Sequence, residues 1–124
     1  MLQNLGALLQ NAAYHFGKGG FAEAEKFLNL ALKIDRKCVD ALHMLGVLLA
    51  SQGRFEESTK ALKSAEKIDP NSGQIQFNLA KSYMDSGNYQ KSLTHHQNAM
   101  NLMPGNESVL INYSATLQKL KHYK

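Results

Sequence analysis

Apolar residues recur at the spacing of an α-helix over most of the chain. In the segment 39–51, Leu42, Leu45 and Leu49 lie three and four positions apart, so they share one face of a helix. The segment 55–68 follows with a face of small and apolar residues and an opposite face of Glu and Lys. The pattern therefore predicts two amphipathic helices in succession.

Turn-forming residues separate these helices from each other and from the next segment. Gly53 can adopt the left-handed conformation that ends many helices. Pro70 cannot continue a helix, and Asn71 after it can cap a new one. Applied along the whole chain, pattern and turns predict helices over 3–17, 21–35, 39–51, 55–68, 73–85, 89–102 and 107–120.

The pattern repeats with a period of 34 residues. Small residues, a turn glycine and an aromatic residue return in register. The matching columns are Ala12, Gly46, Ala80 and Ser114; Gly19, Gly53 and Gly87; Phe21, Phe55, Tyr89 and Tyr123; Ala24, Ser58 and Ser92; and Ala31, Ala65 and Ala99. We expect the small residues to let the two helices of one copy approach closely. Each copy is then a helical hairpin that buries its apolar face only by stacking on its neighbours.

A 34-residue repeat with this order of small, aromatic and proline positions resembles the tetratricopeptide repeat (TPR) family. The resemblance implies an all-α fold, an α-solenoid of about seven helices whose antiparallel pairs wind into a right-handed superhelix. We expect one domain over residues 1–124, with repeats at 5–38, 39–72 and 73–106 and a partial repeat at 107–124.

In the TPR family the first helix of each hairpin lines a concave groove, so the resemblance also assigns partner-binding candidates. They are Leu9, Phe16, His43, Met44, Val47, Phe77, Asn78, Lys81, Met84, Ile111 and Asn112, with Gln10, Ala13, Asp40, Ala50, Gln74, Asp85, Ser108, Ala115 and Lys119 at further groove positions. Such a groove suits an extended peptide or a partner helix, because apolar pockets take side chains and Asn amides bond a peptide backbone. The alternative is that the apolar members pack only against neighbouring helices.

Two kinds of TPR array can be compared at these positions. Arrays that clamp the C-terminal carboxylates of heat-shock chaperones carry Lys, Asn, Asn, Lys and Arg at positions that here read Leu9, Ala13, Met44, Gln74 and Asn78. A site without cations does not hold carboxylates, so we do not expect a clamp. The arrays of bacterial O-linked N-acetylglucosamine transferase-like proteins present a ladder of Asn, which Asn78 and Asn112 match and Gln10 and Met44 do not.

Candidate chemistry is sparse. One cysteine, Cys38, forms no internal disulfide, and no Cys/His set has zinc spacing. Adjacent His95 and His96 point about 100° apart on a helix and cannot share a metal. His96 occupies the column of Leu28 and Leu62, which predicts a place in the core or in a seam between helices. We expect no catalytic residue, no metal and no cofactor, and therefore no enzyme.

A glycine-rich segment partly resembles a phosphate-binding loop but lacks its essential features. Gly17, Lys18, Gly19 and Gly20 faintly resemble a phosphate loop, but the upstream strand and the Ser or Thr after the Lys are missing. The segment falls where the repeat needs its turn between helices. We therefore interpret it as that turn.

Charge adds little. The formal net charge is +4 and the pI about 9.2, yet the Lys residues are scattered and most have a Glu or Asp within one helical turn. We expect neither nucleic acid nor membrane as a partner. The chain starts without the basic region of a secretory signal, which favours the cytoplasm.

The leading hypothesis is a non-catalytic scaffold that binds a protein or peptide. One alternative is the substrate-recruiting part of a larger glycosyltransferase-like enzyme, and another is a self-assembly module. The last helix carries Val109, Leu110, Tyr113, Leu117 and Leu120 with no later helix to cover its far side. We therefore expect dimers, end-to-end crystal contacts or fraying at that end. Because Tyr123 stands where the next helix of the repeat begins, the sequence also suggests a piece of a longer array.

Overall fold

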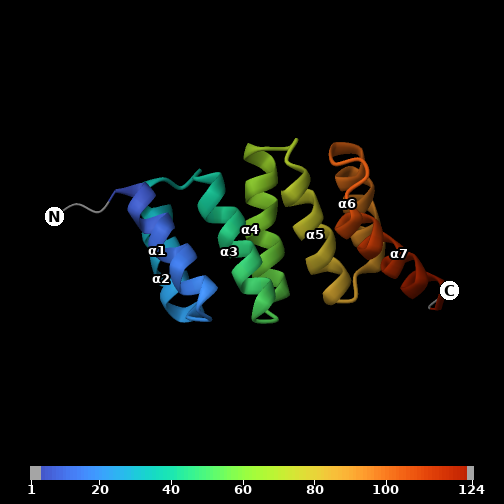
Figure 1. Cartoon of the computed structure of the whole chain (residues 1–124), viewed down its shortest axis with the longest axis horizontal. Helices are drawn as coiled ribbons and strands as arrows, with labels where there is room; N and C mark the ends of the chain where they lie inside the picture. The colour runs from blue at the N-terminus through green and yellow to red at the C-terminus, as the bar shows by residue number, and fades with distance from the viewer. Residues whose placement is uncertain (1–3, 123–124) are drawn as a thin grey trace. The chain divides into compact units, whose positions relative to one another are not determined.

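The computed structural model describes residues 4–122, and the regular elements there are all α-helices. They are α1 (Leu5–Gly17), α2 (Phe21–Ile34), α3 (Val39–Ser51), α4 (Phe55–Ile68), α5 (Gly73–Asp85), α6 (Tyr89–Leu102) and α7 (Glu107–His122). The chain divides into two compact units, one up to Ile68 and one from Asp69. The predicted all-α fold of antiparallel helix pairs is confirmed (Figure 1), and each unit is described by itself.

The predicted helix limits hold to within two residues over the described chain. The second helix ends at Ile34 and the last extends to His122. The predicted start at residue 3 and the aromatic position Tyr123 lie outside the described residues. The predicted left-handed conformation of the turn glycine Gly53 is confirmed, because its φ is 75°.

The caps show one difference from the sequence prediction. Ser72, and not Asn71, caps α5, because its hydroxyl accepts a hydrogen bond from the backbone N–H of Ile75 at 3.2 Å. Cys38 directly precedes α3 and is buried in the core of the first unit, so it is a packing residue.

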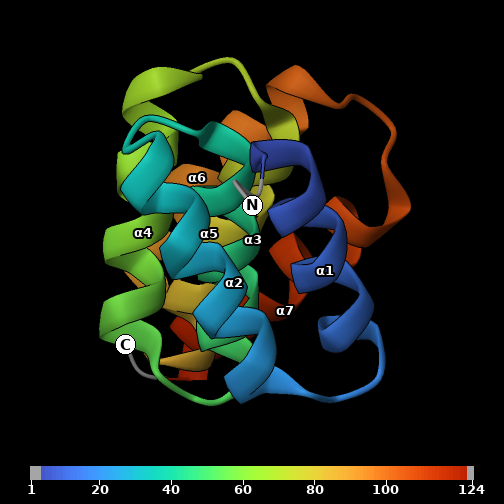
Figure 2. The same cartoon turned by 90° about the vertical axis from the view of Figure 1, so that its left-hand side faces the viewer.

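In the first unit, α1 packs on α2, α3 packs on α4, and α3 also contacts both α1 and α2. Figure 2 shows α1 and α2 side by side, joined by the turn that follows Gly17. The core consists of the aliphatic and small residues of the repeat columns. Its fully buried members include Leu8, Ala12, Ala24, Leu28, Ala31, Ala41 and Leu48.

One hydrogen bond recurs between the two helices of a hairpin. The Ser58 hydroxyl on α4 donates to the Gly46 carbonyl on α3 at 2.7 Å, and the Ser92 hydroxyl on α6 donates to the Ala80 carbonyl on α5 at the same distance. Both bonds are buried. They require backbone and side chain to lie close together, which explains why small residues occupy these columns in each hairpin.

The second unit contains α5, α6 and α7, with α6 packed on both of the others. Its core is more polar than that of the first unit. Buried Gln76 accepts hydrogen bonds at its side-chain oxygen from His95 Nδ1 at 2.8 Å and Asn98 Nδ2 at 3.1 Å, and the ring of His95 stacks on Tyr83. A polar cluster replaces aliphatic packing here, since Gln76 stands in the column of Leu8 and Leu42.

His96 is fully buried, which confirms its predicted place in the core. Neither ring nitrogen has a hydrogen-bond partner among the described residues, and the ring meets Tyr113 edge-on at 6.2 Å between centroids. Burial first, and the neighbouring His95 second, lower the pKa of His96 to about 4. His96 is therefore neutral at physiological pH, and its buried N–H has no partner within residues 4–122.

Candidate functional site

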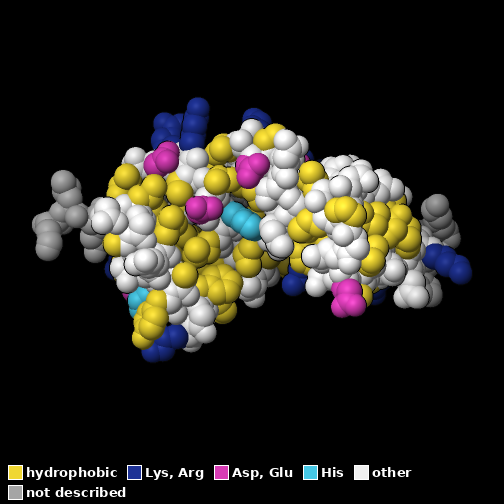
Figure 3. Space-filling model, turned by 45° about the horizontal axis from the view of Figure 1, so that its top comes forward, with side chains coloured by type: hydrophobic (Ala, Val, Ile, Leu, Met, Phe, Trp, Pro, Cys, Tyr) yellow, Lys and Arg dark blue, Asp and Glu magenta, His cyan; other side chains and the backbone are white. Residues whose placement is uncertain are grey.

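An apolar cavity of about 540 Å³ lies between α1 and α3 in the first unit. Its lining residues are Leu9, Ala13, Phe16, Gly17, Asp40, His43, Met44 and Val47. In the left half of Figure 3, which holds the first unit, hydrophobic side chains gather beside histidine and acidic side chains. The size is typical of a site that holds part of a ligand.

Helical spacing builds the two walls of this cavity. Leu9, Ala13 and Phe16 follow one another at four and three positions along α1, so they share a face. Asp40 and Val47 stand seven positions apart on α3 and share a face in the same way. Ala13 and Asp40 are exposed, whereas Leu9, Phe16 and Val47 are half-buried. The walls therefore have a fixed apolar base and an accessible rim.

The lining of the cavity contains one acidic side chain. Asp40 is the charged group among its lining residues, and no Lys or Arg is among them. His43 is half-buried, and burial lowers its pKa, an effect that the Asp40 carboxylate partly offsets. His43 is therefore neutral at physiological pH and does not supply a cation.

The structure brings together five of the predicted site residues at this cavity. They are Leu9, Phe16, His43, Met44 and Val47, and the further groove positions Ala13 and Asp40 join them. Gly17 was not predicted to line it, although its place four residues after Ala13 on the same helix face gave the signal. Gln10 and Ala50 are not among the lining residues. Whether a partner binds here stays a prediction.

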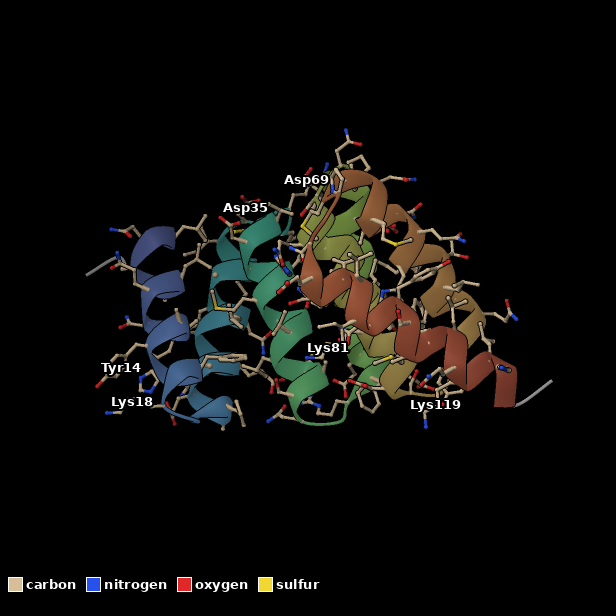
Figure 4. The ribbon with its side chains drawn as sticks, turned by 45° about the vertical axis from the view of Figure 1, so that its right-hand side comes forward. Tyr14, Lys18, Asp35, Asp69, Lys81 and Lys119 are labelled. Carbon is tan, nitrogen blue, oxygen red and sulfur yellow. The ribbon has the colours of Figure 1, made fainter. Side chains whose placement is uncertain are left out.

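The other six predicted site residues belong to the second unit. Phe77, Asn78 and Met84 on α5 are half-buried and Lys81 is exposed. On α7, Ile111 is 67% exposed, and the carbonyl of half-buried Asn112 accepts a hydrogen bond from Thr116. Figure 4 shows Lys81 on α5 and Lys119 on α7. These residues stay predicted binding positions. Like those of the cavity, they lie on the first helix of a hairpin, and the exposed side of such a helix is called the first-helix face.

A second hollow of about 470 Å³ was not foreseen from the sequence. Leucines of α3 form its base, and polar residues of α2 and α4, including Glu25 and Glu57, form its rim. Both carboxylates bind Arg54, with N–O distances of 2.8 Å. The guanidinium of Arg54 holds the pKa of Glu57 below its usual range, through a hydrogen bond first. The carboxylates of this rim are therefore already paired within the protein.

The glycine-rich segment 17–20 connects α1 to α2, as the repeat pattern predicts. Lys18 is the C-cap of α1, and its ammonium donates a hydrogen bond to the Tyr14 hydroxyl at 3.0 Å, with both side chains at the same end of the helix (Figure 4). Gly19 adopts a φ of 81°, as a tight connection between helices requires.

Metal clusters and membrane-spanning helices are both absent from the described chain. Between residues 4 and 122, no group of three or more His, Cys, Asp or Glu side chains could hold a metal ion. No helix in that range has the length and hydrophobicity needed to cross a bilayer.

This chain is a helical-repeat protein. Its helices are paired, a buried hydrogen bond from Ser to a backbone carbonyl recurs between paired helices, and a cavity lies on the first-helix face. The sequence model for the TPR repeat matches residues 46–87, whereas no curated protein matches the chain. The predicted resemblance to the tetratricopeptide repeat family is confirmed, and the described chain has the fold of that family.

Solved TPR structures resemble this chain closely in fold. The TPR domain of Sgt2 from Aspergillus fumigatus has a TM-score of 0.91 at 14% identity, over 96% of this chain and 80% of that one. The first TPR of Spaghetti (RPAP3), bound to the HSP90 peptide SRMEEVD, has a TM-score of 0.91 at 11% identity, over 94% and 93%. A mutant O-GlcNAc transferase of Thermobaculum terrenum has a TM-score of 0.87 at 24% identity over 94% of this chain, which spans only 23% of that enzyme.

Proposed function

We propose that this chain is a non-catalytic interaction module that binds a protein or peptide on its first-helix face. The observation that carries the proposal is the apolar cavity between α1 and α3, which gathers predicted binding residues from two consecutive repeats. An exposed rim over an apolar base suits a side chain presented by an extended peptide or a partner helix. The peptide-bound RPAP3 domain supports this use of the fold.

Filling the cavity is the direct test. Ala13 is exposed and lines the cavity, so Ala13→Trp occupies the space without disturbing the core. We expect affinity capture from a cell extract to lose its specific partner by about tenfold or more with this variant. Ala22→Trp is the matched control, because Ala22 is exposed on α2 and does not line the cavity.

A second variant separates the two units. Phe77→Ala combined with Asn78→Ala changes α5 and leaves the cavity untouched. Loss of the partner with this variant alone would move the binding site to the second unit. Equal capture by wild type and all variants would contradict binding on the first-helix face.

A second candidate function rests on the fold shared with the O-GlcNAc transferase, of which this chain spans a small part. In this case the chain recruits substrates for a catalytic domain of a larger protein. Half-buried Asn78 and Asn112 are its candidate contacts to substrate backbone. The complete reading frame decides: a frame without a glycosyltransferase domain excludes this candidate.

A third candidate, self-assembly, is favoured by the apolar surface of α7. Leu110 is 44% exposed and Leu117 is 42% exposed, whereas Val109 is buried, so the prediction that it stays uncovered is wrong. The residues equivalent to Leu110 in the earlier repeats, Leu8, Leu42 and Gln76, are all buried. We expect the wild-type mass from light scattering to rise over a tenfold concentration range, because association covers these leucines.

The variant Leu110→Lys with Leu117→Lys should keep the monomer mass over the same concentration range. Leu30→Lys on α2 is the control, since Leu30 is comparably exposed at 39% but lies in the first unit. A wild-type mass that stays constant at the monomer value excludes assembly through α7.

A further inference from the structure

The charge of the cavity between α1 and α3 indicates which kind of peptide it accepts. We propose that its occupant is a peptide segment that places a bulky apolar side chain in the cavity and a Lys or Arg beside Asp40. This inference rests on the proposed function and adds the chemical class of the partner to it.

The apolar part of the proposal follows from the lining. Leu9, Phe16, Met44 and Val47 line the cavity and are half-buried by the protein itself, so parts of their side chains remain open to a ligand. Covering such surface with an apolar side chain is favourable, and a polar side chain would lose its hydrogen bonds to water there. A volume of about 540 Å³ accommodates a large side chain together with part of its neighbour.

The cationic part follows from Asp40. Its carboxylate lies in the first turn of α3, is exposed at the rim, and is the charged group among the lining residues. An acidic group beside low-dielectric walls attracts a cation and repels an anion. His43 does not reverse this preference, because burial keeps its imidazole neutral at physiological pH. A basic residue next to the apolar anchor is therefore favoured, and an acidic one is disfavoured.

The peptide bound by the RPAP3 domain has the opposite charge to the peptide proposed for this cavity. The peptide SRMEEVD bound by RPAP3 carries two Glu and one Asp. Recognition of such a peptide requires cations, and none of the residues that line this cavity is Lys or Arg. We expect SRMEEVD to bind this chain weakly compared with a basic peptide.

Three matched peptides test the proposal. Each is a capped, fluorescein-labelled octapeptide with a central Leu-Phe pair in a Gln and Ser frame, flanked by Lys, by Gln or by Glu. Fluorescence anisotropy with the full chain at low ionic strength gives each Kd. We expect the Lys peptide to bind about fivefold more tightly than the Glu peptide, with the Gln peptide between them.

Two variants locate this preference. Asp40→Asn should reduce the ratio between Lys and Glu peptides to less than about twofold. Glu56→Gln, which makes the same charge change at an exposed position of α4 outside the cavity lining, should leave the ratio unchanged. Ala13→Trp should weaken the Lys peptide by about tenfold, and circular dichroism confirms that each variant is folded.

The outcomes distinguish this inference from the proposed function. If the Glu peptide or SRMEEVD binds as tightly as the Lys peptide and Ala13→Trp still weakens it, the charge preference is wrong and the cavity remains a binding site. If Asp40→Asn leaves the ratio unchanged, the assignment to Asp40 is wrong. If none of the peptides binds, the inference is wrong, while partner capture with Ala13→Trp still decides the proposed function.

Discussion

Replacing His96 with leucine is expected to raise the free energy of unfolding by about 1–3 kcal/mol near neutral pH. The gain arises because a neutral imidazole buries an N–H without a partner among the described residues, and leucine has no such group. Leucine fits the position, since Leu28 and Leu62 occupy the same column and are both fully buried. Urea denaturation followed by circular dichroism measures the difference.

The gain should grow in acid. The pKa of His96 is about 4 in the folded chain, below its ordinary value of 6.5, so between these values the unfolded chain binds a proton that the folded chain does not. The stability contribution is therefore complete above about pH 6.5 and is lost as the pH falls toward 4. Between about pH 7.5 and about pH 5 the wild type should lose about 2 kcal/mol through this group, and His96→Leu should not.

The reverse substitution is the matched control. Leu62→His places the same imidazole at the equivalent position of the first unit, where it should lower stability and create a new loss of stability in acid. Hydrogen exchange localises each effect to its own helix pair, α5 and α6 for His96 and α3 and α4 for Leu62. A His96→Leu variant that keeps the acid sensitivity of the wild type would contradict the assignment of that sensitivity to His96.

The sequence predicts the helices well because the same turn and small residues recur at equivalent positions of each repeat. Turn glycines recur at Gly19, Gly53 and Gly87, and small residues recur where two backbones approach, so each boundary has three independent indications. The columns also predict burial: Ala31, Ala65 and Ala99 are all fully buried. Repetition constrains these features because they depend on geometry that each hairpin must reproduce.

Features that depend on contacts specific to one repeat were not predictable in the same way. The column of His96 indicates burial, but it does not indicate that the described residues around the ring, Tyr113 among them, offer its nitrogens no hydrogen bond. The polar cluster of Gln76 and His95 breaks the repeat pattern, because the columns of these two residues hold no such pair in the other copies. The resemblance to the TPR family implied most of the cavity lining. The pairing of Glu25 with Arg54, in contrast, joins side chains that no column of the repeat relates.

Gly46→Ala is expected to lower the free energy of unfolding by about 2 kcal/mol. A Cβ at this position would lie 2.4 Å from Leu62 Cγ, a branched and fully buried atom that cannot move aside cheaply. Relief requires α3 and α4 to separate, which also stretches the buried bond from the Ser58 hydroxyl to the Gly46 carbonyl. These costs exceed the ~1 kcal/mol that alanine gains over glycine within a helix.

The effect is one of packing at a particular contact, and a double-mutant cycle isolates it. Gly17→Ala is the control for helix propensity, because a Cβ there meets no atom within 4 Å, and it should leave stability unchanged or raise it. Leu62→Ala removes the atoms that the new methyl group would meet, so the cost of Gly46→Ala should shrink by about 1–3 kcal/mol in that background. Ala12 and Ala80 occupy the same column without difficulty, because each helix pair settles at its own separation. Equal costs of Gly46→Ala in both backgrounds would mean that the close approach of α3 and α4 does not depend on the missing side chain.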